Sequence, residues 1–337
     1  MQQTLVQFHP PFVVFFGDIQ QADFAKTGMG LVQWRRDDCV GQIRLPGCAA
    51  DAGVPDMSVE DAKGAGARTL IIGVAPIGGD IPPSWLEALT QAAAAGIDIV
   101  GGLHIRLESL VGLETAAARG NARLINARVP PASLSVASGL KRSGKRLLTV
   151  GTDCACGKKY TALALDRELR LRGIDSEFRA TGQTGIMIAG KGIPIDAVVA
   201  DFLTGAAEML SPSAADEHWD VIEGQGSIFH PAYLQVTVGL VVGSQPDAFV
   251  VCHDPERSTI SGWPDFALPT IEQVIERTIQ FGSLTNPIIR CVGISLNTSK
   301  LSSDARELTL EAFRDQTRLP CVDPLIDGVA PIIDFLL

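Results

Sequence analysis

Short apolar runs alternate with longer segments of helical periodicity along most of the chain. This alternation is typical of βαβ units and predicts an α/β fold with parallel sheets. In the first part, strands are expected over 69–74, 98–103 and 122–126, with helices after the first two. Ser84 and Glu87 have capping-box spacing at the start of the first helix. The Gly-rich, irregular residues 9–67 are expected to be an extension of this small Rossmann-like sheet.

A second and longer series of elements follows the segment 126–146, whose prolines, serines and basic residues predict a linker. Strands are expected over 146–150, 176–180, 219–222, 248–252, 288–296 and near Cys321. Helices are expected over 157–172, 195–210, 230–240, 270–281 and 304–317. The 337 residues suffice for two domains. We predict a Rossmann-like domain over 1–145 and a P-loop NTPase-like parallel-sheet domain over 146–337.

The charge balance limits the kinds of partner. There are 28 basic and 38 acidic residues, a net charge of -10, and no long basic block. These features argue against nucleic acid and anionic membranes as partners, but a small anion needs only one local cluster. No apolar run approaches the roughly 20 residues that span a bilayer. The apolar stretch 234–242 suits an oligomer interface and a buried core equally well, and we expect a homo-oligomer.

The cysteines and the N-terminal residues bear on the compartment. Seven cysteines without C-x-x-C spacing indicate reduced thiols, with neither a disulfide framework nor a zinc site. The N-terminal apolar run lacks a basic start and a small-residue cleavage site. A cytoplasmic protein is therefore expected.

The strongest local motif is a G-x-x-x-x-G-K run between a predicted strand and a predicted helix. In such a P-loop, backbone N–H groups surround a phosphate, while the lysine and the helix N-terminus add positive field. The candidate phosphate-binding residues are Gly151, Thr152, Asp153, Cys154, Ala155, Cys156, Gly157 and Lys158.

One position departs from the P-loop pattern. A Ser or Thr hydroxyl normally follows the lysine and ligates Mg²⁺, but here Lys159 and Tyr160 follow. An ammonium cannot ligate a metal, and Thr161 lies about 200° further round the helix than Lys159. The loop therefore favours a diphosphate that is held and never cleaved, as in coenzyme A, with Lys159 supplying the charge of the missing metal.

Two further polar residues follow predicted strands, where ligands collect in open α/β sheets. Glu223 comes after the strand 219–222, and Asn297 after the strand that ends at 296. Glu223 is a candidate for ligand chemistry or for a simple turn cap. Asn297 is a candidate for reading an adenine edge or for forming an Asx-turn.

Taken together, these motifs resemble the D-glutamate N-acetyltransferase family of two-domain P-loop proteins, and more distantly dethiobiotin synthetase. The resemblance covers nearly the whole chain past residue 65. Its residues are the loop 151–161, Arg-Ala-Thr-Gly-Gln-Thr-Gly at 179–185, Ile-Asp-Ala-Val at 195–198 with Asp201, Glu-Gly-Gln-Gly-Ser at 223–227 with His230-Pro231, and His-Asp-Pro at 253–255. The resemblance implies a Rossmann-like domain, a P-loop domain, and acetyl transfer from acetyl-CoA to the amine of D-glutamate. Because Lys159 replaces the metal-binding hydroxyl, we expect no metal.

That chemistry needs a base for the amine and donors for the oxyanion. Glu223 and His230 are the candidate bases, with Asp201 behind them, although His230 is as good a candidate for a helix cap. The oxyanion candidates are the backbone N–H groups of 224–226 and the side chains of Gln225 and Ser227.

The substrate must also be held by its carboxylates, for which arginine offers a planar fork. Arg179 is the first candidate and Arg257 the second, each with a surface ion pair as the alternative. Thr181 and Gln183, in a polar turn after Arg179, are further substrate candidates. Weaker candidates in the first domain are His104, Arg106 and Lys26.

Other readings stay open at this level. Cys154 or Cys156 at a helix N-terminus suits an acyl-enzyme, but small side chains close to phosphate explain both more simply. The alternative function is an ATP- and Mg²⁺-dependent ligase or kinase of the dethiobiotin-synthetase type. A nucleotide-responsive binding protein is the third.

Overall fold

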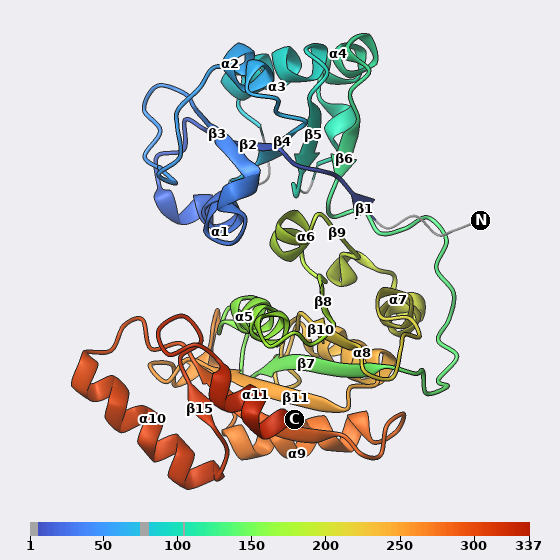
Figure 1. Ribbon diagram of the computed structural model, residues 1–337, viewed down its shortest axis with the longest axis vertical. Helices are drawn as coiled ribbons and strands as arrows, with labels where there is room; N and C mark the ends of the chain where they lie inside the picture. Colours follow the sequence, from blue (N-terminus) through green and yellow to red (C-terminus); the bar gives the residue numbers. More distant parts are fainter. Residues whose placement is uncertain (1–5, 75–80, 104) are drawn as a thin grey trace. The chain divides into compact units, whose positions relative to one another are not determined.

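The computed structural model describes residues 6–74, 81–103 and 105–337, which form two compact units (Figure 1). Unit 1 comprises residues 1–132 together with 182–197, and unit 2 comprises 133–181 and 198–337. Each unit is built around a parallel sheet with helices packed against it. The predicted α/β class, with a Rossmann-like unit and a P-loop unit, is confirmed.

The chain passes between the units at three points, whereas the sequence analysis places a single boundary after residue 145. The segment 182–197 belongs to unit 1 because β9 (Lys191–Gly192) pairs antiparallel with β1 (Val6–Gln7). In the same segment, α6 (Gln183–Ala189) packs against α1 (Lys26–Trp34). Periodicity cannot reveal this excursion, since the partners of both elements lie far earlier in the chain.

The sheet of unit 1 has the strand order β3-β2-β4-β5-β6, and all of its pairs are parallel. The strands are β2 (Phe12–Gly17), β3 (Cys39–Arg44), β4 (Thr69–Ile72), β5 (Asp98–Gly101) and β6 (Leu124–Asn126). The helices besides α1 and α6 are α2 (Val59–Gly64), α3 (Pro83–Ala94), α4 (Leu113–Gly120), η1 (Ala22–Ala25), η2 (Arg36–Asp38), η3 (Leu107–Ser109) and η4 (Ile195–Ala197).

Two expectations for unit 1 are wrong. Residues 9–67 are no extension, because β2 is an interior strand of the sheet and every one of its residues is buried. Its continuous apolar run is what a parallel strand covered on both faces requires. The capping box at Ser84 is absent, because Pro83 already occupies the first helical position and Ser84 lies within α3.

The sheet of unit 2 has the order β15-β14-β11-β7-β10-β8, again all parallel. Its strands are β7 (Lys145–Gly151), β8 (Ser176–Arg179), β10 (Trp219–Ile222), β11 (Ala248–His253), β14 (Arg290–Leu296) and β15 (Cys321–Val322). Its helices are α5 (Lys158–Leu171), η5 (Ala200–Phe202), α7 (Leu203–Leu210), α8 (Leu234–Ser244), α9 (Ile271–Gly282), α10 (Ser303–Thr317) and α11 (Ala330–Leu336). Figure 1 shows α5 on one face of this sheet and α9 on the other.

The predicted strands of unit 2 are confirmed, but the helices differ at three places and a hairpin is present in addition. The helix expected over 195–210 is broken, because Val199 is extended and α7 begins only at Leu203. The helix expected from residue 230 begins at Leu234. The hairpin of β12 (Thr259–Ile260) and β13 (Trp263–Ala267), and also α11, were not predicted.

The apolar stretch 234–242 serves the core of unit 2. It lies in α8, where Val236, Leu240 and Val241 are buried. The close approach of α7 requires glycine, since a Cβ on Gly243 would lie 2.3 Å from the carbonyl oxygen of Thr204. Leu234 and Tyr233, at the start of this helix, stay partly exposed.

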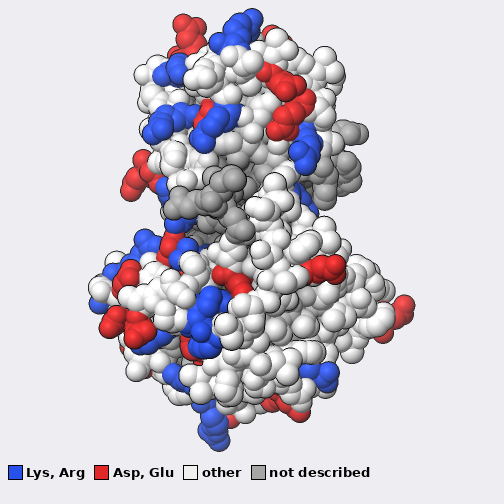
Figure 2. Space-filling view, turned by 90° about the vertical axis from the view of Figure 1, so that its right-hand side faces the viewer, with Lys and Arg blue, Asp and Glu red and all other residues white. Residues whose placement is uncertain are grey.

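Within the described residues, no helix is both long enough and apolar enough to cross a bilayer. The face of the molecule in Figure 2 has Lys and Arg interspersed with Asp and Glu, and its described residues form no continuous basic stripe there.

Candidate active site

The phosphate loop joins β7 to α5 at the carboxyl edge of the unit 2 sheet. Gly151 must lack a side chain, because a Cβ there would lie 2.5 Å from Cys156 Sγ. Gly157 has φ +109 and Ala155 has φ +51, so the loop turns through left-handed conformations. These turns place the loop between the ends of β10 and β11, the two neighbours of β7.

Lys158 carries its charge at the centre of the loop. The side chain is only 6% exposed, and Nζ donates to the carbonyl of Asp153 at 2.6 Å. Thr152 is fixed from the other side, with Oγ1 3.0 Å from His253 Nδ1. A buried ammonium beside a helix N-terminus attracts a phosphate strongly.

Arg257 stabilises the outer side of the loop. Its Nη1 donates to Asp153 Oδ2 at 3.0 Å and to the Cys154 carbonyl at 2.8 Å, and Nη2 donates to the Ala155 carbonyl at 3.0 Å. Nε pairs with Asp254 at 3.0 Å. The sequence predicts that Arg257 binds a substrate carboxylate. In the structure its guanidinium group holds the phosphate loop instead.

Lys159 and Tyr160 open α5 next to Lys158. Lys159 Nζ lies 4.3 Å from the centroid of the Tyr160 ring. Burial lowers the pKa of Lys159, while the nearby Glu223 carboxylate opposes this shift. Burial also raises the pKa of Tyr160. Lys159 is therefore partly buried beside the loop and differs from a fully solvated surface lysine.

Thr161 is turned away from the phosphate position, as the helical geometry predicts. Its hydroxyl donates to the Gly157 carbonyl at 3.1 Å and lies 2.8 Å from Ser295 Oγ, in the interior. Thr161, the first hydroxyl residue of the α5 backbone turn after Lys158 other than Tyr160, therefore contributes its side chain to the packing of α5 against β14.

Glu223 lies at the carboxyl end of β10 and is 3% exposed. Its Oε2 accepts the Thr181 N–H at 2.9 Å, and the Thr181 hydroxyl donates to the Glu223 carbonyl at 2.7 Å. Gln225 Nε2 donates to Thr181 Oγ1 at 3.0 Å. Three of the predicted site residues therefore form one network beside the loop, with Thr181 at its centre.

His230 lies beside the loop, with a ring nitrogen within 4.8 Å of Asp153 and Cys154. Its Nδ1 accepts the Ala232 N–H at 3.2 Å, so the neutral ring carries its proton on Nε2. The ring packs against Tyr233 and Trp263, each at 4.6 Å between centroids. Burial lowers the pKa of His230, with Asp153 opposing. The capping alternative for His230 fits these bonds, because Nδ1 accepts an N–H two residues on and the His230 carbonyl accepts the Leu234 N–H at 3.1 Å, where α8 begins.

Asp153, Cys154 and His230 each have one ligating atom within 4.8 Å of the others. This set does not fit a metal ion. Asp153 Oδ2 already accepts from Arg257 and from the Ser261 N–H, and Nε2 of His230 carries a proton. Burial raises the pKa of the Cys154 thiol although Lys158 opposes, which favours the simple view of a small loop residue over an acyl-enzyme.

Arg179 does not reach the loop network. Its Nε pairs with the buried Asp220 at 2.6 Å and Nη2 with Glu177 at 2.9 Å. His218 completes this cluster, with its two nitrogens 2.7 Å from Asp175 and 3.1 Å from Asp220. The role of Arg179 in binding a substrate carboxylate is therefore corrected to a structural ion pair between β8 and β10.

Most of the remaining oxyanion candidates already donate hydrogen bonds within the protein. The Ser227 hydroxyl donates to the Thr152 carbonyl at 3.0 Å, and the Gly224 N–H donates to Thr149 Oγ1 at 3.0 Å. Gln225 uses one amide hydrogen for Thr181, and a carboxamide nitrogen has two. The second hydrogen is the donor that we retain for the oxyanion.

Asn297 forms the Asx-turn. Its Oδ1 accepts the Ser299 N–H at 3.3 Å, so an adenine contact has no support from its geometry. Asp201 is exposed on η5 and has no part in the Glu223 network. Gln183 lies in α6, and Arg106 and Lys26 also belong to unit 1. His104 lies outside the described residues.

Sequence reasoning gave no role to the residues that support the loop. Asp254 holds Arg257, and the Ser261 N–H donates to Asp153 Oδ2 at 2.9 Å. Trp263, on the unpredicted hairpin, packs on His230. The Ser-Gly pair at 261–262 between apolar residues is the hairpin signal that could have located them.

This arrangement defines a two-unit protein in which a P-loop unit accompanies a Rossmann-like unit. The family model for the P-loop domain of DUF1611, a domain of unknown function, matches residues 135–333. The Rossmann-like model DUF1611_N matches residues 43–130. A DUF1611 family protein from Anabaena variabilis has a similar solved structure, with a TM-score of 0.83, 33% identity, and coverage of 97% of this chain and 99% of that one. The chain belongs to this family.

Two curated relatives give the family its activity name. The D-glutamate N-acetyltransferase of Tritonibacter scottomollicae is 46% identical over 326 residues, 97% of this chain and 98% of that protein. The D-glutamate N-acetyltransferase of Pseudoalteromonas sp is 43% identical over 328 residues, 97% of this chain and 99% of that protein. The chain is thus a member of the D-glutamate N-acetyltransferase family.

Proposed function

We propose that this N-acetyltransferase transfers the acetyl group of acetyl-CoA to the amine of D-glutamate, and that the P-loop holds the phosphates of coenzyme A. The similarity to two D-glutamate N-acetyltransferases, 46% and 43% identity over nearly the full length, supports the reaction. The observation that carries the coenzyme assignment is Lys159. It stands, partly buried and close to Glu223, where a phosphate-cleaving P-loop has its metal-binding hydroxyl.

The loop would bind the coenzyme diphosphate through backbone N–H groups and the buried Lys158 ammonium. Lys159 adds a second positive charge at the same helix start. The His230 ring lies near Asp153 and Cys154 and would supply a further N–H donor. A thioester substrate needs its phosphates only as an anchor, so binding without a metal is sufficient.

Glu223 is our proposed general base. A buried carboxylate held by Thr181 can take the ammonium proton of D-glutamate, whereas Nε2 of His230 already carries one. The free amine then attacks the thioester carbonyl; a C–N bond forms, the C–S bond breaks, and the departing sulfur takes the second amine proton, so that coenzyme A leaves as its thiol. The Gln225 amide would donate to the oxyanion of the tetrahedral intermediate.

The assay is release of coenzyme A thiol from acetyl-CoA and D-glutamate in metal-free buffer with EDTA, together with mass spectrometry of N-acetyl-D-glutamate. We expect both products without ATP. Turnover that appears only with ATP and Mg²⁺ would overturn the proposal. Lys158→Ala should lose acetyl-CoA binding in native mass spectrometry.

The second candidate is an ATP- and Mg²⁺-dependent ligase or kinase. It is favoured by the Glu223 carboxylate at the end of the strand beside the P-loop, where nucleotide-cleaving enzymes hold their metal. The same EDTA assay separates the two functions. A cytoplasmic location and a homo-oligomer stay predictions, to be tested by fractionation and by light scattering.

A further inference from the structure

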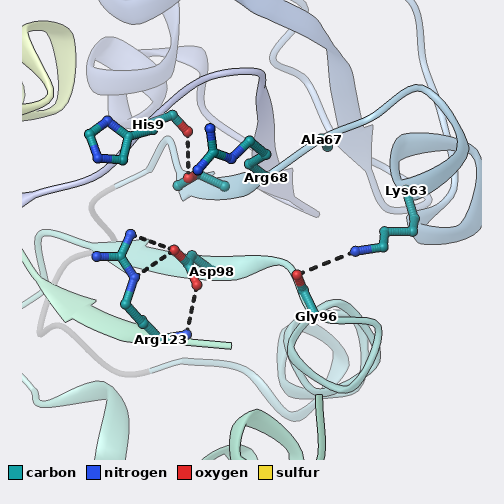
Figure 3. Close-up of a pocket in the computed structure, with 8 residues that line it drawn as sticks. His9, Lys63, Ala67, Arg68, Gly96, Asp98 and Arg123 are labelled. Atoms are coloured by element: carbon teal, nitrogen blue, oxygen red, sulfur yellow. Dashed lines mark hydrogen bonds and ion pairs between the residues drawn. The ribbon is translucent and has the colours of Figure 1, made fainter. Parts of the chain in front are cut away.

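Unit 1 contains a cavity at the amino ends of its strands, opposite to the edge where α/β sheets usually bind ligands (Figure 3). Thr69 begins β4 and Asp98 begins β5. The cavity volume is about 210 Å³. Its lining residues are His9, Lys63, Ala67, Arg68, Thr69, Gly96, Asp98 and Arg123.

The base of this cavity is fixed by backbone hydrogen bonds. The N–H groups of Arg68 and Thr69 both donate to the Pro11 carbonyl, at 2.9 and 3.3 Å, and the Asp98 N–H donates to the Arg68 carbonyl at 2.9 Å. The Thr69 hydroxyl donates to the His9 carbonyl at 2.8 Å. These bonds hold the backbone segments that carry His9 and Arg68 beside each other, and the side chains of both residues are exposed to solvent.

The charges in the cavity do not cancel. Asp98 is fully engaged by Arg123, whose backbone N–H donates to Oδ1 at 2.7 Å and whose guanidinium donates to Oδ2 at 2.8 and 2.6 Å. Lys63 has only a 3.4 Å contact to the Gly96 carbonyl. Among the described residues, the guanidinium of Arg68 has no hydrogen-bond or ion-pair partner. Two uncompensated cations therefore line one cavity in a chain whose net charge is -10.

We propose that this cavity binds a small dianion, either phosphate or a short dicarboxylate, independently of the reaction proposed above. Figure 3 shows His9 and Arg68 above the Asp98–Arg123 pair, and Lys63 at the right of the view, near Gly96. Arg68 offers a planar fork that matches a carboxylate or phosphate with two parallel hydrogen bonds. Lys63 offers a point charge, and His9 offers a ring N–H.

The test is NMR of the full chain, following the imidazole signal of His9 while phosphate, glutarate or sodium chloride is added at matched ionic strength. His9→Gln assigns the signal among the five histidines. We expect a saturable shift with one or both dianions and none with chloride. Phosphate and glutarate, titrated separately, distinguish the two sources. An equal response to chloride would show screening only and overturn the proposal.

Arg68→Gln should weaken the binding by about tenfold, the loss of one charge-assisted contact. The matched control is Arg119→Gln, an exposed arginine on α4 that does not line the cavity, and its affinity should equal that of the unaltered chain. Melting curves without added anion establish that both variants are folded. Unchanged dianion affinity in a folded Arg68→Gln chain would contradict the proposed site.

Discussion

At the scale of single residues, the surroundings of the phosphate loop distinguish between candidate residues that the sequence alone could not distinguish. Glu223 and His230 are equivalent candidate bases by sequence, and one backbone N–H distinguishes them, because Ala232 donates to Nδ1 of the histidine. Arg179 and Arg257 are the first and second candidates for a substrate carboxylate by sequence, yet each pairs with a carboxylate of the protein itself. Side-chain partners of this kind are set by tertiary structure and leave no local pattern.

Glu223→Gln should lower kcat by about 10²–10⁴-fold while acetyl-CoA still binds, because the amide cannot take the amine proton. Steady-state kinetics and calorimetry with acetyl-CoA separate the two effects. Glu217→Gln is the matched control, since Glu217 is exposed and precedes the same strand. A Glu223→Gln chain with unaltered kcat would exclude this carboxylate as the base.

The pKa of Lys159 gives a pH dependence. Burial holds this pKa below the ordinary 10.5, so the ammonium loses its proton at a lower pH than a solvated lysine does. Acetyl-CoA affinity should therefore fall as the pH rises toward 10.5, and Lys159→Arg should keep the affinity constant over that range. Calorimetry between pH 7 and 10, about the range where lysine charge changes, measures both. A parallel fall in the arginine variant would assign the effect to another group.

The same shift acts on stability in the opposite direction. The folded pKa of Lys159 lies below the unfolded one, so between these values the unfolded chain binds more protons. The contribution of Lys159 to the free energy of unfolding consequently increases as the pH rises through that window.

At the scale of elements, the phosphate loop depends on the segment after β11. Arg257→Gln removes donors to Asp153, Cys154 and Ala155, which should weaken acetyl-CoA binding by about ten- to a hundredfold, with kcat retained at saturation. Arg257→Lys should recover part of the affinity. The control is Arg170→Gln, an exposed ion pair on α5. An equal loss in kcat would mean that Arg257 does more than position the loop.

The α7–α8 contact gives a stability prediction. Gly243→Ala should destabilise unit 2 by about 1–3 kcal/mol, because the new methyl meets the backbone at Thr204. Gly64→Ala, in a helix with open space around it, should instead stabilise the chain by about 0.5–1 kcal/mol. Urea denaturation of both variants tests the pair. A neutral Gly243→Ala would show that the helices can move apart.

At the scale of the whole molecule, periodicity predicted the strands of the two parallel sheets from β4 onward, since buried parallel strands give short continuous apolar runs. The phosphate loop was predicted from spacing and context alone. Periodicity did not predict β2 and β3, which lie among glycines and prolines. It also did not predict that residues 182–197 belong to unit 1. That excursion depends on pairing with β1 and on packing against α1, which only the folded chain brings together.

The excursion predicts how fragments behave. In α6, Ile186, Met187 and Ile188 are buried, and α1 is one of their covering elements in unit 1. A chain that begins at Ser133 lacks α1 and should expose these side chains and self-associate. Replacing 182–197 by a short polar linker in that fragment should restore a monodisperse species. Light scattering compares the two, and equal association would mean that another surface is responsible.

The excursion also sets an order of events during synthesis. A ribosome releases unit 1 nearly whole by residue 132, yet β9 and α6 emerge only after β7, α5 and β8 of unit 2. The first unit must therefore wait, with the partner surfaces of β1 and α1 uncovered, while the phosphate loop is already outside the tunnel. Unit 1 is consequently completed only after the first part of unit 2 has been synthesised, and unit 2, which continues to residue 337, is completed after it.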